Sequence, residues 1–410
     1  MTQNDNSSSS NSRLAAARIV SSWIKSDTFP DRELDAVENS RAFVMEVVLG
    51  IVRWYGALTW IRDRRVQQRP RPAVDACILV GLYQLLFMDD VQEYAAVNET
   101  VEAAKIAGGE KAANFVNAVL RRAQADKRQI FQALEKQPPA TRFSHPRLLI
   151  DRWTKQFGDA AMARLCEWNN RRADVVVRTN KKLSIEGQPH PFAPGRFLIL
   201  PRGVSVTDVP GFAEGSFYVQ DPSTSVAPEL LDAKPGETVL DACAAPGGKT
   251  LQIAEMMKGQ GTLIAMDPAA DRLKPLRENI ARLKWDFIQV VEGDVTKQRT
   301  ATRFDAILLD VPCTNTGVIR RRPDVRWRFS PERLRAACDK QAAILDAAAG
   351  RLADGGRIVY STCSLELEEN EGQIDRWLAR HPQFRLADSR RLFPPESGTD
   401  GAFAALLVRK

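Results

Sequence analysis

Residues Thr238–Thr250 read TVLDACAAPGGKT and join a short apolar run to a glycine-rich turn. The run is apolar and contains β-branched residues, which is typical of a strand buried on both faces of a parallel sheet. Gly247 and Gly248 let the backbone approach a ligand closely, and Lys249 then begins a helix. This succession of strand, turn and helix predicts the first unit of a doubly wound, Rossmann-like domain.

The same alternation continues to the end of the chain. Further apolar runs, with helical segments among them, lie at Thr262–Asp267, Phe287–Glu292, Phe304–Asp310, Arg357–Thr362 and Phe403–Val408. Helices between parallel strands provide right-handed crossovers. We therefore expect an α/β fold with a Rossmann-like sheet over residues 236–410.

Three regions precede this domain. Residues 1–12 are rich in Ser and Asn and predict a disordered tail. Over residues 13–136 the pattern is helical, as in Val44–Val52, where apolar residues recur on one helix face. We expect an all-helical domain there. After Gln137-Pro138-Pro139, residues 141–235 mix a helix with short strands and predict a small α/β connecting module.

Composition limits the class of protein. Hydrophobic residues make up 44% and charged residues 27%, the balance of a soluble globular protein. The net charge of +7 suits a polyanionic partner such as nucleic acid, although many soluble enzymes carry as much. The six cysteines contain no C-x-x-C pair and the chain has three histidines, so we expect no metal site. The polar N-terminus and the absence of about 18 consecutive apolar residues predict a cytoplasmic protein without a membrane span. A monomer would suffice.

The glycine-rich turn and three strand-end aspartates predict a cofactor site. Ligands of such sheets bind outside the carboxyl ends of the strands. Asp267 is placed to accept hydrogen bonds from ribose hydroxyls, and Asp294 from an adenine amino group. One such aspartate alone would more simply cap a helix. Three of them around this turn favour a nucleoside cofactor over a dinucleotide, whose G-x-G-x-x-G fingerprint is missing. The predicted cofactor residues are Cys243, Ala244, Ala245, Pro246, Gly247, Gly248, Lys249, Asp267, Asp294 and Asp310.

Two cysteines follow neighbouring strands of the predicted sheet. Cys313 comes just after Asp310, and Cys363 just after Thr362. A single buried cysteine is usually an inert apolar residue, but two thiols beside a carboxylate suggest chemistry. Cytosine C5 attacks a sulfonium methyl only after a thiolate adds at C6. Asp310 would stabilise the charge on the ring, and a base must then remove the C5 proton. We expect one cysteine to attack and the other to release, with Lys249 able to favour a thiolate.

An arginine-rich stretch follows the first of these cysteines. Residues 318–328 hold five arginines against one aspartate, with a tryptophan among them. Such a stretch would bind phosphates and stack a base, or else form a solvated charged face. The candidate RNA contacts are Arg320, Arg321, Arg322, Arg326 and Trp327.

Residues 241–250, 309–327 and 361–370 closely resemble the bacterial RNA cytosine-C5 methyltransferases of the RsmB (Sun) type. The helical front half is similar to the RNA-binding NusB domain. This resemblance implies S-adenosylmethionine as cofactor and small-subunit (16S) ribosomal RNA as partner. It assigns nucleophilic attack to Cys363, release to Cys313 and contact with the cytosine to Asp310. The chain departs from the family at Leu367, where proline is usual, and at Ala402, where an aromatic residue is common.

Three alternatives stay open from the sequence. A transfer RNA substrate would keep the same chemistry. A non-catalytic RNA-binding factor would be expected to lack Cys313, Cys363 or Asp310, and all three are present. An NAD-dependent oxidoreductase is disfavoured by the missing glycine fingerprint.

Overall fold

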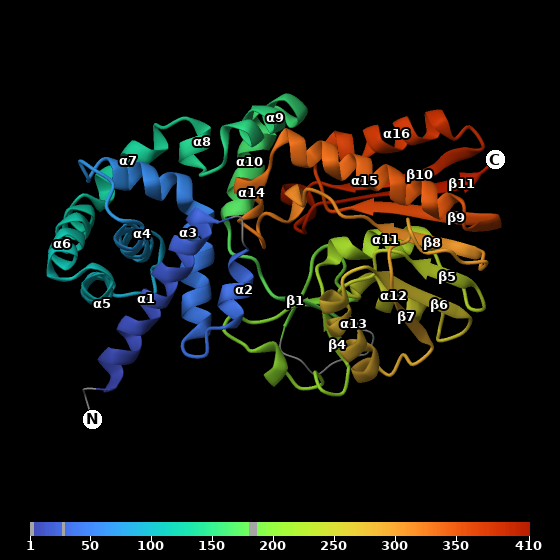
Figure 1. Cartoon of the computed structure of the whole chain (residues 1–410), viewed down its shortest axis with the longest axis horizontal. Coiled ribbons are helices and arrows are strands. Elements are labelled where there is room, and N and C mark those ends of the chain that lie inside the picture. Colours follow the sequence, from blue (N-terminus) through green and yellow to red (C-terminus); the bar gives the residue numbers. More distant parts are fainter. Residues whose placement is uncertain (1–3, 27–28, 180–186) are drawn as a thin grey trace. The chain divides into compact units, whose positions relative to one another are not determined.

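The chain forms two compact units, as the computed structural model in Figure 1 shows. The structure describes residues 4–26, 29–179 and 187–410. The first, here called the helical unit, comprises residues 1–171 and 321–328. The second, the sheet unit, comprises residues 172–320 and 329–410. The chain therefore leaves the sheet unit once, contributes eight residues to the helical unit, and returns.

The helical unit is built around one apolar helix. Helix α4 (Pro72–Phe87) is buried on nearly every side and packs against α1, α3, α5 and α6. A helix that is apolar all round belongs in a core, and its neighbours need only one apolar face each. The surrounding helices are α1 (Asn4–Lys25), α2 (Pro30–Asp35), α3 (Arg41–Asp63), α5 (Glu93–Gly108), α6 (Glu110–Ala125), α7 (Lys127–Glu135), α8 (Pro139–Arg142), α9 (Arg147–Phe157) and α10 (Asp159–Asn170).

Two predictions about this half of the chain need correction. Helix α1 begins at Asn4, so residues 4–12 are not the predicted disordered tail. The helix continues N-terminally from its buried residues, here from Leu14 onward, because a nucleated helix gains one hydrogen bond for each residue that it adds. Helices α8–α10 also belong to the helical unit, so the predicted module at residues 141–235 is divided between the two units.

Helix α3 is long and apolar enough to cross a membrane by length and composition, the only such helix among the described residues. Half of that apolar stretch is buried inside the unit. Core helices of globular proteins meet the same criteria, so this helix is weak evidence for a membrane.

The sheet unit begins with a small antiparallel sheet of order β2-β3-β1-β4. Its strands are β1 (Val176–Thr179), β2 (Gln188–Pro189), β3 (Phe197–Ile199) and β4 (Phe217–Val219). Helix α11 (Val226–Leu231) then leads into the main sheet.

The main sheet has seven strands in the order β10-β11-β9-β8-β5-β6-β7. Strands β5 (Thr238–Asp241), β6 (Thr262–Asp267), β7 (Ile288–Glu292), β8 (Phe304–Asp310) and β9 (Leu352–Thr362) are parallel. Strand β11 (Ala402–Arg409) lies antiparallel between β9 and β10 (Phe384–Leu392). The strand order reverses at β5, which pairs with both β6 and β8. This switch point is where such sheets bind ligands.

Helices cover both faces of the main sheet (Figure 1). Helices α11, α12 (Gly248–Met256) and α13 (Ala270–Leu283) contribute to the core on one face. Helices α15 (Pro331–Ala349) and α16 (Glu371–Arg380) contribute to the core on the other. The predicted Rossmann-like fold is therefore confirmed, with two additions. The antiparallel strand β11 makes the sheet mixed, and strand β10, which the sequence pattern missed, pairs with β11 at the edge.

Candidate active site

The glycine-rich turn after β5 packs closely at two glycines. Gly247 has φ +111°, and a Cβ there would lie 2.4 Å from Leu276 Cδ1. At Gly248 a Cβ would lie 2.9 Å from Gln220 Nε2. The left-handed φ of Gly247 requires glycine, and this residue leads directly into α12 at the sheet edge.

Asp267 at the end of β6 holds the turn in place. Its carboxylate accepts hydrogen bonds from the backbone N–H groups of Ala245 at 3.2 Å and Ala269 at 3.0 Å. Arg272 adds a contact that the sequence did not suggest, because its guanidinium donates to the Ala245 carbonyl at 2.7 Å. The buried Asp267 therefore joins the glycine-rich turn to the start of α13.

Asp294, after β7, has a simpler environment. It accepts hydrogen bonds from the N–H and the hydroxyl of Thr296, at 2.9 and 2.7 Å, and the hydroxyl bond lowers the pKa of Asp294. These contacts are those of an ordinary turn-capping aspartate. A contact between Asp294 and adenine stays a prediction.

An ion pair lies between the turn and the end of β8. Lys249 Nζ is 2.6 Å from Asp310 Oδ2. Burial disfavours the ammonium, but the Asp310 carboxylate outweighs it, so the pKa of Lys249 is raised. The same ammonium interacts electrostatically with Cys363. Asp241, fully buried nearby, accepts a hydrogen bond from the Thr250 hydroxyl at 2.7 Å, and burial raises the pKa of Asp241 to about 7.

The two predicted thiols lie together at the ends of adjacent strands. Cys313 Sγ and Cys363 Sγ are 3.4 Å apart. Asn315 Oδ1 is 3.1 Å from Cys363 Sγ and 3.7 Å from Cys313 Sγ. Asn315 has φ +61°, a left-handed conformation that asparagine tolerates better than most residues. The hydrogen bond with Cys363, followed by burial, raises the pKa of Cys313, which favours its neutral thiol.

Comparison with known proteins places the chain in a family. A family model described as 16S rRNA methyltransferase RsmB/F matches residues 228–408, and the NusB family model matches residues 10–125. Ribosomal RNA small subunit methyltransferase B of Pseudomonas putida is 34% identical, over 97% of this chain and 98% of its own. The chain belongs to the RsmB family of ribosomal RNA small subunit methyltransferases.

A second relative agrees with this family, and a solved structure agrees with the fold. A probable ribosomal RNA small subunit methyltransferase B of Synechocystis is 36% identical over 90% of this chain and 87% of its own. The crystal structure of PH0851 shares the fold, with a TM-score of 0.79 and 24% identity over 98% of this chain and 99% of that one. The resemblance drawn from the sequence motifs is confirmed.

Glu369 belongs to the candidate site of this RsmB-family chain, although the sequence did not single it out. Its fully buried carboxylate accepts hydrogen bonds from the Thr314 N–H at 2.9 Å and from the hydroxyls of Thr314 and Ser364. Gln341 donates to it at 2.9 Å. Thr314 and Ser364 each directly follow one of the cysteines. One carboxylate thus fastens both cysteine loops, although burial raises the pKa of Glu369.

The two loops are also joined directly. The Gly317 N–H donates to the Cys363 carbonyl at 2.9 Å, and the Leu365 N–H donates to Thr316 Oγ1 at 2.9 Å. A Cβ at Gly317 would lie 2.5 Å from the Cys363 carbonyl oxygen. The distance between the thiols is therefore set by both loops together.

Three residues of the arginine-rich segment have internal polar partners. Arg326 is fully buried and donates to carbonyl oxygens of Arg53, Ser144 and Asn169, all at 3.1 Å. Trp327 Nε1 donates to the Val52 carbonyl at 2.7 Å.

In the sheet unit, Arg320 is 8% exposed and is bound by Asp174 at 2.8 Å. Arg320, Arg326 and Trp327 therefore hold the fold through internal polar partners, and their contact with RNA stays a prediction that these partners do not support. Arg321 and Arg322 are partly exposed, and their RNA contacts stay a prediction.

Proposed function

We propose that the chain methylates carbon 5 of a cytosine in 16S ribosomal RNA through a covalent bond between Cys363 and carbon 6. The observation that carries this proposal is the pair of thiols 3.4 Å apart beside the Lys249–Asp310 ion pair. A simple methyl transfer to a nucleophilic nitrogen or oxygen needs no thiol. Two thiols and a fixed carboxylate suit the activation of an unreactive ring carbon.

Cys363 is the proposed nucleophile. Its sulfur lies 3.1 Å from Asn315 Oδ1 and 3.4 Å from the Cys313 sulfur, at the carboxyl end of the strand next to β8. When the Cys363 sulfur bonds to C6, electron density moves to C5 and the ring. Asp310, held by Lys249, would share a proton with ring N3 and so stabilise that charge.

Cys313 is the proposed base for release. Its pKa is raised first by the hydrogen bond with Cys363, and that bond ends once the Cys363 sulfur is bonded to C6. Cys313 would then lose its own proton to solvent water and, as a thiolate, take the proton from C5 after methylation. The electron pair of the C5–H bond restores the double bond between C5 and C6, and the Cys363 thiolate leaves.

S-adenosylmethionine is the proposed cofactor, and it would supply an electrophilic methyl group. The turn fits this cofactor because Gly247 and Gly248 have no side chain to cover the backbone at the switch point of the sheet. Asp267 and Asp294 would hold the nucleoside, with Cys243 to Lys249 lining the turn. We further propose that the protein works in the cytoplasm as a monomer bound to RNA.

Methylation with tritiated S-adenosylmethionine tests this proposal. The protein would be incubated with unmodified small-subunit RNA and, separately, with transfer RNA, and 5-methylcytosine would be mapped. We expect label in 5-methylcytosine of the small-subunit RNA. Label in transfer RNA alone would overturn the substrate, and RNA binding without any transfer would favour a non-catalytic factor.

A further inference from the structure

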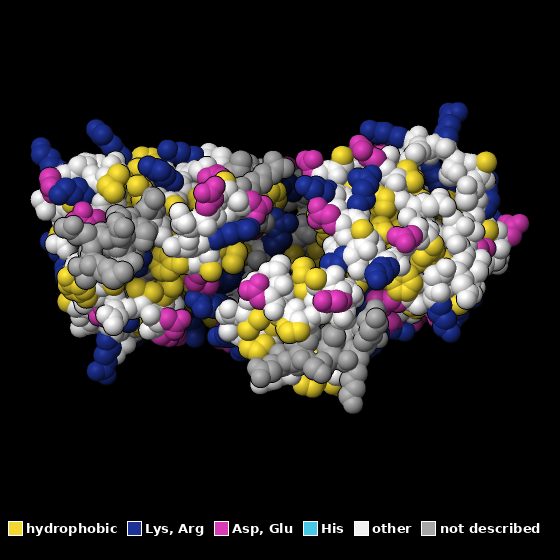
Figure 2. Space-filling model, turned by 90° about the horizontal axis from the view of Figure 1, so that it is seen from below, with side chains coloured by type: hydrophobic (Ala, Val, Ile, Leu, Met, Phe, Trp, Pro, Cys, Tyr) yellow, Lys and Arg dark blue, Asp and Glu magenta, His cyan; other side chains and the backbone are white. Residues whose placement is uncertain are grey.

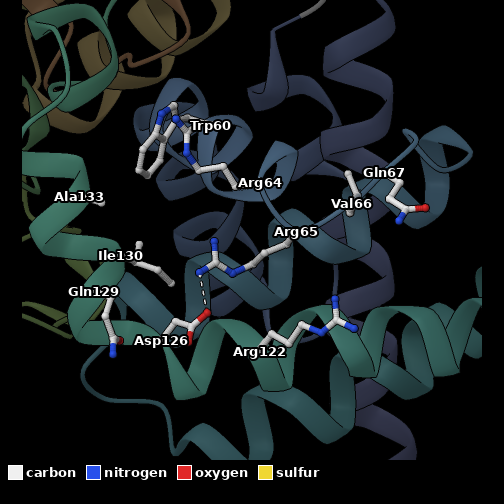
Figure 3. Close-up of a pocket in the computed structure, with 10 residues that line it drawn as sticks. All are labelled: Trp60, Arg64, Arg65, Val66, Gln67, Arg122, Asp126, Gln129, Ile130 and Ala133. Atoms are coloured by element: carbon white, nitrogen blue, oxygen red, sulfur yellow. Dashed lines mark hydrogen bonds and ion pairs between the residues drawn. The ribbon is translucent and has the colours of Figure 1, made fainter.

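A hollow of about 600 Å³ opens on the helical unit, far along the sequence from the thiols. It lies between the end of α3 and the junction of α6 with α7, as Figure 3 shows. Trp60 and Arg64 line one side, and Arg65, Arg122 and Asp126 line another. The catalytic chemistry proposed above uses none of these residues.

The hollow carries uncompensated positive charge. Arg65 is paired with Asp126 at 3.3 Å, drawn as a dashed line in Figure 3. Among the residues that the structure describes, Arg64 and Arg122 have no acidic partner. Both side chains are exposed. Two free guanidinium groups at one opening form a site for a polyanion.

An aromatic surface lies beside this charge. The Arg64 guanidinium stacks over the Trp60 ring, 4.0 Å from its centroid. Trp60 Nε1 is buried without a hydrogen-bond partner among the described residues. Flat arginine and tryptophan surfaces stack on unpaired bases, whereas inorganic anions or acidic peptides need no such surface.

Overall charge does not explain RNA binding by itself. On the face drawn in Figure 2, the described basic side chains are scattered with acidic ones among them. That face therefore shows no continuous basic patch among the described residues.

We propose that the hollow binds a single-stranded segment of the RNA substrate. Arg64 and Arg122 contact phosphates, and the stacked Trp60–Arg64 pair receives a base. This inference rests on the proposed function, because the proposed function names the RNA that the hollow would bind.

RNA binding by the full chain, measured without cofactor over a range of salt concentrations, tests this site. The double variant Arg64→Glu, Arg122→Glu should weaken binding of small-subunit RNA. Its plot of log affinity against log salt should be shallower by about 1.4, or roughly 0.7 for each lost phosphate contact. Trp60→Leu should weaken binding about tenfold by loss of stacking.

Arg121→Glu is the matched control. Arg121 is exposed on the same helix as Arg122 but contacts Gln124 and Asn98 rather than the hollow. We expect wild-type affinity for this control, and thermal melts should show that all variants are folded. Equal affinity and salt slope in the double variant and the control would overturn the proposal. Polyglutamate would be tested in the same assay as an acidic peptide without bases. If the double variant lost polyglutamate binding but kept RNA binding, the proposal would also be overturned. Because no methyl transfer is measured, failure here is distinct from failure of the proposed catalytic function.

Discussion

Replacing Glu369 by alanine should loosen both cysteine loops and slow methyl transfer. Four donors would lose their acceptor: the N–H and hydroxyl of Thr314, the Ser364 hydroxyl and the Gln341 amide. The two hydroxyls can turn to each other, because their oxygens are 3.2 Å apart. The Thr314 N–H and the Gln341 amide have no such freedom.

The expected magnitude follows from those two donors. A buried donor left unpaired costs about 1–3 kcal/mol, so the loops should lose about 2–4 kcal/mol after water enters the vacated space. Misplacing a reacting group by about 1 Å costs roughly 100-fold in rate, and we expect a loss of that order in single-turnover methyl transfer.

Glu369→Gln is the matched control. Its carbonyl oxygen can keep the bonds from Thr314 N–H and Gln341, while its amide can donate to the two hydroxyls. We therefore expect Gln to stay within about 1 kcal/mol of wild type.

Hydrogen exchange measured by mass spectrometry on peptides containing Cys313 and Cys363 would report local opening of each loop. Wild-type exchange in the alanine variant would refute the role of Glu369. Equal damage in both variants would show that the negative charge, rather than the hydrogen-bond geometry, is what matters.

Three other predictions follow from buried groups. Burial raises the pKa of Asp241 from 3.8 to about 7. The free energy of unfolding of the sheet unit should therefore fall as pH rises through that range, by up to about 4 kcal/mol. Denaturation at several pH values should show this slope in the wild type and not in Asp241→Asn. Gly247→Ala places a Cβ 2.4 Å from Leu276 at φ +111°, and should weaken binding of S-adenosylhomocysteine roughly tenfold by calorimetry; unchanged affinity would show that the turn adapts. Arg326→Ala leaves three backbone carbonyls without their donor and should destabilise the helical unit by about 3 kcal/mol or more. We expect faster hydrogen exchange in α8–α10. Unchanged exchange there would contradict the structural role of Arg326.

Much of the sheet could be predicted because its strands are locally distinct. The runs Thr262–Asp267 and Phe304–Asp310 coincide with β6 and β8, since buried parallel strands are continuous apolar segments. Strand β10 escaped prediction because its sequence, FRLADSRRL, is charged and largely exposed, as suits an edge strand. Its strand character depends on pairing with β11, which no local pattern records.

Some residues of the candidate site could likewise be predicted from the sequence, and others could not. Cys313 and Cys363 could be placed together because each follows a strand that the sequence identifies. Glu369 could not, since its bond to Thr314 spans 55 residues and exists only when β8 and β9 are paired. For Arg326 the sequence predicts a surface position, because arginine is almost never fully buried. The structure buries Arg326 completely.

The assignment of roles to the two thiols is the central claim, and denaturing gels with labelled RNA test it most directly. Cys313→Ser should accumulate protein covalently linked to small-subunit RNA in the presence of S-adenosylmethionine, because serine cannot take the C5 proton and release the adduct. Cys363→Ser should give no linked band and no methylation. A linked band with Cys363→Ser, or full turnover by that variant, would contradict the account.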